Sequence, residues 1–157
     1  MLLYPVIAAL IIAADQISKY YTRINLSDSS VSLIGDFLTL RYVENTGAAF
    51  SLFEGNKMVT VVLTAVLIVV CLILTFTEYR KGSRFLPFCL TMVWAGGIGN
   101  LIDRLSRGFV TDMISCGSFP VFNVADMFVT CGCILAVLAV LFGDKKQAPM
   151  GRHDRNF

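Results

Sequence analysis

The sequence has few charged residues and almost no histidine. Charged residues make up 15% of the 157 positions, and the formal net charge at pH 7 is only +2. Nucleic-acid-binding domains usually carry a strongly basic patch, so this balance argues against a nucleic-acid partner. The single histidine, His153, lies in a polar C-terminal stretch and has no cysteine cluster beside it. We therefore expect no metal and no cofactor.

The cysteines do not form a redox motif. Cys131 and Cys133 are separated by one glycine, so they do not make the C-x-x-C pattern of thiol oxidoreductases. With Cys71 and Cys89 they lie in apolar runs, where cysteine acts as a small apolar residue. Cys116 lies in a connecting segment, and we assign it no role.

Apolar residues are abundant and are concentrated in long runs. They form 56% of the chain, and the mean hydropathy is +0.72. A helix needs about 20 apolar residues to cross a bilayer. The sequence therefore predicts one membrane domain over 1–157, an all-α bundle of four transmembrane helices. The expected spans are about 2–21, 58–77, 85–104 and 122–142.

The segments between the spans predict a small sheet and an orientation. Short alternating apolar pieces within 25–56 indicate strands outside the membrane core. This segment carries one arginine against four acidic residues, whereas the next loop and the tail, 144–157, are basic. Because basic residues stay on the cytoplasmic side, we expect both termini to be cytoplasmic. The segments 25–56 and 106–120 are then extracytoplasmic.

The stretch 109–126 holds two carboxylates, Asp112 and Asp126, in apolar surroundings. Charge beside hydrocarbon is costly, so such residues usually have a function. Two carboxylates brought close together do not both ionise easily, and one keeps its proton near neutral pH. An acid and a base in one pocket are what peptide hydrolysis by water requires. We therefore predict that Asp112 and Asp126 form a catalytic pair.

Two further polar motifs allow a structural and a functional interpretation. Asp15 and Lys19 are four residues apart, so they share one helix face. They are either an ion pair at the interface, with Lys19 extending to water, or the brace of a polar pocket. Asn45-Thr46-Gly47 is typical of a tight turn, although it also permits a close backbone approach.

The third predicted span becomes richer in glycine and in polar residues near its end. Gly96, Asn100 and Arg104 recur every four residues and share one face. They indicate either a glycine packing seam, with an interfacial pair of Asp103 and Arg107, or part of a binding site. The seam leaves Asn100 unexplained, because an amide inside hydrocarbon needs partners. The predicted topology brings the polar residues of five segments to one end of the bundle, namely Asp15, Asn45, Asn100, Asp112, Asn123 and Asp126.

Five motifs occur in a fixed order along the chain. They are D-Q-x-x-K at 15–19, N-T-G-A-A-F at 45–50, G-G-x-G-N-x-x-D-R at 96–104, G-x-V-x-D at 108–112 and F-N-x-A-D at 122–126. Together they resemble the lipoprotein signal peptidase family, the bacterial signal peptidases II. Each motif alone is weak, but the ordered set is specific and covers the chain from 15 to 126.

The resemblance implies an intramembrane aspartic protease of the bacterial plasma membrane. It implies that the enzyme cleaves prolipoproteins on the N-terminal side of a diacylglyceryl-cysteine, among membrane lipid, and that globomycin blocks it. It also implies a β-sheet cradle within 25–56 and a mobile loop with a short helix within 106–120. The residues that it assigns to catalysis are Asp112 and Asp126. Those that it assigns to the substrate site are Asp15, Lys19, Asn45, Gly96, Asn100, Arg104 and Asn123.

One position departs from the family pattern, and two other functions compete. Met113 stands where the family usually has phenylalanine, which predicts a softer pocket wall.

A small proton or cation transporter would use Asp15, Asp112 and Asp126 as its path. The chain has no internal repeat of the transporter kind, and its acids gather at one side. A non-catalytic scaffold, whose acids serve helix assembly, is the third possibility.

Overall fold

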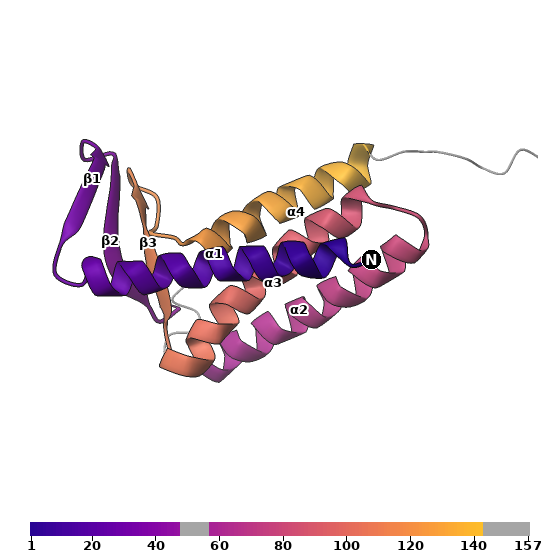
Figure 1. Ribbon diagram of the computed structural model, residues 1–157, viewed down its shortest axis with the longest axis horizontal. Coiled ribbons are helices and arrows are strands. Elements are labelled where there is room, and N and C mark those ends of the chain that lie inside the picture. The colour runs from indigo at the N-terminus through magenta and orange to yellow at the C-terminus, as the bar shows by residue number, and fades with distance from the viewer. Residues whose placement is uncertain (48–56, 143–157) are drawn as a thin grey trace, which may run out of the picture.

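The structure is a computed structural model that describes residues 1–47 and 57–142. Long helices lie side by side, and a small sheet covers one end of them (Figure 1). The helices are α1 (Leu3–Asn25), α2 (Lys57–Arg80), α3 (Phe85–Arg107) and α4 (Val124–Phe142). The predicted tail and the end of the N-T-G-A-A-F motif, 48–50, lie outside the described residues.

Within the described residues, three helices are long and apolar enough to cross a membrane: α2, α3 and α4. α1 is as long as α3, with 23 residues, but its sequence includes the charged Asp15 and Lys19. The prediction of a helical membrane bundle with a small sheet is therefore confirmed, and the count of four spanning helices stays a prediction.

α3 is the central helix of the bundle. Most of its residues are buried, whereas α2 and α4 expose most of their apolar side chains, as expected for surfaces that face lipid. The buried core joins residues of α1, α2 and α3, with Ile11, Ile68 and Trp94 among them. α3 therefore contacts each of the other helices, and polar groups along it are well placed to link them.

Glycines bring α3 and α4 into close contact. A Cβ atom added at Gly96 would lie 2.6 Å from the carbonyl oxygen of Ala125, and one at Gly132 would lie 2.8 Å from that of Cys89. Real side chains do not fit at these distances, so both positions need glycine. The predicted packing seam is present, and Gly96 is buried in it against the residue that precedes Asp126.

The sheet is antiparallel in the order β1-β2-β3. β1 (Ser30–Ile34) and β2 (Leu38–Asn45) come from the segment where strands were predicted. β3 (Val110–Cys116) comes from the segment between α3 and α4.

The expectation of a short helix in that segment was wrong, because Val110–Cys116 form a strand and residues 117–123, which the structure describes, form no helix. The β-branched residues of β3 favour an extended chain, and pairing with β2 satisfies its backbone groups. Cys116 consequently ends a strand and does not lie in a free loop. The register places Asp112 opposite Val43, and Asn45 opposite Val110, so β2 delivers Asn45 beside the first acid.

Candidate active site

Asp126 lies in the first turn of α4 and is held there by Asn123. The backbone N–H of Asp126 donates to Oδ1 of Asn123 at 2.9 Å, and the backbone N–H of Asn123 donates to Oδ2 of Asp126 at 3.2 Å. This reciprocal arrangement is a capping box, which satisfies two amides that the helix start leaves free. The cap thus fixes the carboxylate of Asp126 at the helix N-terminus, where the helix dipole favours a negative charge.

Asp112 is buried on β3 between two asparagine amides. Nδ2 of Asn123 donates to its Oδ1 at 2.6 Å, and Nδ2 of Asn45 donates to its Oδ2 at 2.9 Å. Only 1% of Asp112 is exposed. Burial raises the pKa of Asp112 from 3.8 to about 6, although the two amides lower it, and Asp126 adds to the rise. Asp112 is thus a carboxyl group that keeps its proton more readily than an exposed one.

Asn45 serves the site and the turn at the same time. Its Oδ1 accepts the backbone N–H of Gly47 at 2.8 Å, and Gly47 has a positive φ of 96°. The predicted turn is therefore present. Because this turn occupies the amide oxygen, the amide nitrogen faces Asp112.

Asn100 on α3 connects the second acid to a buried lysine. Its Nδ2 donates to Oδ1 of Asp126 at 2.7 Å. Its Oδ1 accepts from Nζ of Lys19 at 2.9 Å and from Nδ2 of Asn123 at 3.1 Å. An ammonium group can only donate, so Lys19 fixes the oxygen on its own side and the nitrogen toward Asp126. These contacts give the Asn100 amide the partners that a glycine packing seam alone would not provide.

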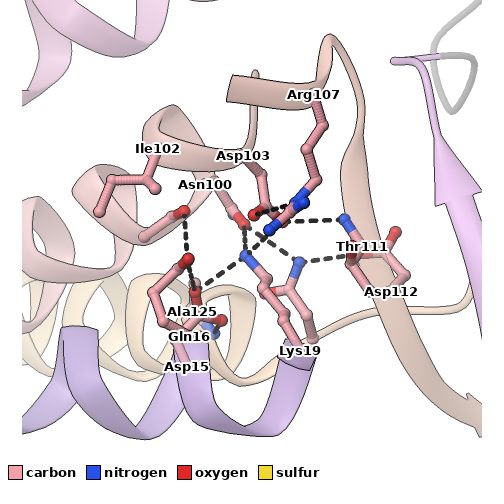
Figure 2. Close-up of polar contacts among 12 residues, drawn as sticks. Asp15, Gln16, Lys19, Asn100, Ile102, Asp103, Arg107, Thr111, Asp112 and Ala125 are labelled. Carbon is pink, nitrogen blue, oxygen red and sulfur yellow. Dashed lines mark hydrogen bonds and ion pairs between the residues drawn. The ribbon is translucent and has the colours of Figure 1, made fainter. Parts of the chain in front are cut away.

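Lys19 lies at the centre of a buried charge cluster (Figure 2). Its Nζ is 2.8 Å from Oδ2 of Asp15 and 3.3 Å from Oδ2 of Asp103, and all three side chains are fully buried. The interpretation of Lys19 as a residue that extends to water is therefore wrong. Asp15 also accepts the backbone N–H of Ala125 at 2.9 Å, so the cluster holds the start of α4.

Asp103 also belongs to this cluster, although its sequence position indicated only an interfacial pair with Arg107. Its Oδ2 accepts the backbone N–H of Thr111 at 3.0 Å, one residue before Asp112 (Figure 2). Its Oδ1 lies 3.7 Å from Nε of Arg107. The spacing of three residues after Asn100 was the available signal, because it places Asp103 near the same face of α3. Asp103 thus ties β3 to α3 beside the first acid.

Two cavities lie at the site, one lined in part by Asp126 and the other by Asn45, which contacts Asp112. A small polar one is lined by Asn45, Thr46, Thr60, Arg104, Gly108 and Phe109. An apolar one of about 330 Å³ is lined by Phe119, Phe122, Asp126, Met127, Thr130 and Cys131. Asp126 thus faces an apolar pocket, while Arg104 lies beside Asn45 on the polar side. Met113 is buried, with 4% exposed.

The structure thus brings together the two acids, which are fourteen positions apart in the chain, because both contact Asn123. Asn45, Asn100 and Lys19 join the same network, and Asp15 lies beneath it. Such a set of two carboxylates and oriented amides is suited to general acid–base chemistry. Gly96 packs against Ala125 and Val129 of α4 and contributes no side chain to the network.

Comparison with known proteins identifies the family. Residues 7–142 match the family described as Signal peptidase (SPase) II. The chain is 38% identical over 159 residues to a lipoprotein signal peptidase of Enterococcus faecalis, with 99% of this chain and 98% of that protein covered. It is 38% identical over 139 residues to that of Streptococcus pneumoniae, with 87% and 90% covered.

A solved structure agrees with these sequence matches. It is described as a bacterial membrane enzyme, and it superposes with a TM-score of 0.79 and 28% identity over 96% of both chains. Because the family match and the relatives extend over nearly the whole chain, this protein belongs to the signal peptidase II family of bacterial membrane peptidases.

Proposed function

We propose that this chain is an aspartic endopeptidase that removes the signal peptide from lipid-modified prolipoproteins. The observation that carries the proposal is the contact of both Asp112 and Asp126 with Asn123. The family match supports a signal peptidase II function. The curated relatives are named lipoprotein signal peptidases, which supports a lipoprotein precursor as the substrate.

In the proposed mechanism a water molecule lies between the two carboxyl groups. The ionised aspartate takes a proton from the water, which attacks the scissile carbonyl carbon, and the protonated aspartate donates to the carbonyl oxygen. The roles exchange as the tetrahedral intermediate collapses and the amine leaves. The raised pKa of Asp112 supports a pair that retains one proton near neutral pH.

The other residues differ in whether they contact the two acids. Asn45, Asn100 and Asn123 orient the carboxylates directly. Asp15 and Lys19 are fully buried, so in this proposal they brace the site and do not contact substrate. Arg104 borders the polar cavity with Asn45, where it would hold a substrate carbonyl. Gly96 acts through packing, because it lets α4 approach α3.

The apolar pocket at Asp126 supports a substrate that comes from the membrane. Besides the acid, its lining is mostly aromatic and sulfur-bearing, with Phe119, Phe122, Met127 and Cys131. A signal peptide or the acyl chains on the modified cysteine would bury apolar surface there. In this proposal globomycin-type inhibitors would compete for the same pocket.

α1 is proposed as the fourth span. Its 23 residues would extend about 34 Å as a helix, which exceeds the roughly 30 Å of a bilayer core. Asp15 and Lys19 face the bundle, while Val6, Leu10 and Ile17 are exposed. An apolar outer surface with charges turned inward is what a spanning helix requires. Both termini would then be cytoplasmic, and the acids would face the extracytoplasmic side.

The family match gives no support to the transporter alternative. The acids Asp15, Asp112 and Asp126 also meet in one network at the sheet end of the bundle, so they do not form a line across it.

Replacing either acid should abolish cleavage. Asp112→Asn and Asp126→Asn each remove a group that exchanges a proton, so the rate should fall at least about 100-fold. The measurement is cleavage of a lipid-modified prolipoprotein by purified protein in detergent, with the exposed Asp28→Asn, whose side chain contacts Ser27, as the matched control. A folded variant of either acid that cleaves at the normal rate would contradict the mechanism.

The stability of the protein should depend on pH through Asp112. Its folded-state pKa of about 6 exceeds the unfolded value, so the folded chain holds this proton more tightly. This contribution is complete below pH 4 and is lost as the pH rises through 6, a change of about 3 kcal/mol in the free energy of unfolding. Unfolding in detergent from pH 4 to 7 should show this loss in the parent chain and a smaller one in Asp112→Asn. If the free energy of unfolding changed with pH by the same amount in both proteins, Asp112 would have no raised pKa.

Asp103→Asn should slow catalysis although Asp103 is not one of the two acids. The change leaves Lys19 with one fewer carboxylate and weakens the anchor of β3 at Thr111, at a cost of about 1.5–3 kcal/mol in stability. We expect a lower kcat with a KM near the parent value, since Asp112 shifts and the substrate pocket does not. Kinetics and thermal unfolding measured on the same preparation check this. Unchanged kcat would remove Asp103 from the site.

A further inference from the structure

A further pocket lies at the end of the bundle opposite the sheet. There the chain N-terminus lies beside the connection from α2 to α3 (Figure 1). The pocket has a volume of about 540 Å³ and is lined by Met1, Leu3, Tyr4, Arg84, Phe85 and Phe88. Its walls are mostly apolar side chains from the N-terminus, α1 and α3, and Arg84 is the one charged side chain among these lining residues. None of these residues belongs to the network around Asp112 and Asp126.

Arg84 is held in place without an acidic partner among the described residues. Its guanidinium carbon lies 5.4 Å from the centroid of the Tyr79 ring. Tyr79 packs edge-on against Tyr4, with ring centroids 5.7 Å apart, and the Tyr4 hydroxyl donates to the Arg84 carbonyl at 3.3 Å. The neighbouring cation Lys81 differs, because its Nζ lies 2.7 Å from the carboxylate of Glu78. Arg84 thus presents an uncompensated positive charge at the pocket.

The surroundings match the region where a bilayer meets water. Paired tyrosines are typical of the level of lipid headgroups. Leu3 and Phe85 are 65% and 52% exposed, so the pocket leaves apolar surface uncovered beside a cation. Arg80 stacks on Phe76 and adds a second cation to the same connection. Since Lys81 neutralises Glu78, the connection attracts an anion.

We propose that this pocket binds one anionic phospholipid. The lipid phosphate contacts the guanidinium of Arg84, whose planar set of donors suits phosphate oxygens. One acyl chain covers Leu3, Phe85 and Phe88. A lipid in this position joins the start of α1 to the start of α3 and so stabilises the bundle at the end away from the acids. The site is independent of the proposed peptidase mechanism.

The test is native mass spectrometry of the full chain in detergent, titrated with phosphatidylglycerol or with phosphatidylcholine of the same acyl chains. The expected result is one retained phosphatidylglycerol, bound more tightly than phosphatidylcholine. Arg84→Gln should weaken phosphatidylglycerol binding about fivefold, the factor expected for one cation near a charged membrane surface. Lys81→Gln, in the same connection but already paired, should leave it unchanged.

A second variant and a competition experiment test the two parts of the pocket separately. Leu3→Glu places a carboxylate on an exposed position of the pocket and should remove the preference for phosphatidylglycerol. Glycerol 3-phosphate, which has the phosphate but no acyl chain, should not compete. Equal binding of the two lipids, equal losses from Arg84→Gln and Lys81→Gln, or competition by glycerol 3-phosphate would overturn the proposal. A dimer that excludes lipid would also overturn it, because a second copy would then cover the pocket.

Discussion

The site depends on the amide of Asn123, which contacts both acids. The amide nitrogen donates to Asp112, and the amide oxygen caps the helix that carries Asp126. A carboxylate buried beside hydrocarbon is stable only with hydrogen-bond donors, and here neutral amides supply them. Amides leave the acids free to hold or release a proton, whereas a direct contact with a cation would favour the ionised form.

Lys19 lies one layer further from the acids, and its position explains the rest of the frame. Lys19 donates to the oxygen of Asn100, so the amide nitrogen of Asn100 faces Asp126. The charge of Lys19 is balanced by Asp15 and Asp103, which also accept the backbone amides of Ala125 and Thr111. Each acid of the pair therefore directly follows a residue whose backbone N–H is bound by this cluster. Buried charges of this kind are costly unless every partner is present, which couples the positions of α1, α3, α4 and β3.

Much of this arrangement could be predicted from the sequence, for reasons that differ by element. The apolar runs predicted the membrane helices, and the five motifs placed Asp112, Asp126 and the asparagines in one site. β3 was missed because its seven residues follow a helix and pair with a strand distant in the chain, which local pattern does not show. The sequence left open whether Lys19 extends to water or braces a polar pocket, because a lysine near the end of a predicted span usually extends to water. Asp103 was missed because its partner is the backbone of Thr111, and no side-chain motif reports a backbone contact.

Whether one asparagine holds both carboxylates is tested by the cleavage rate of Asn123→Ala on a lipid-modified prolipoprotein. We expect the folded variant to lose most of its kcat, because Asp112 loses a donor and Asp126 loses its cap. A folded Asn123→Ala protein that cleaves at the parent rate would show that the two acids do not depend on this residue.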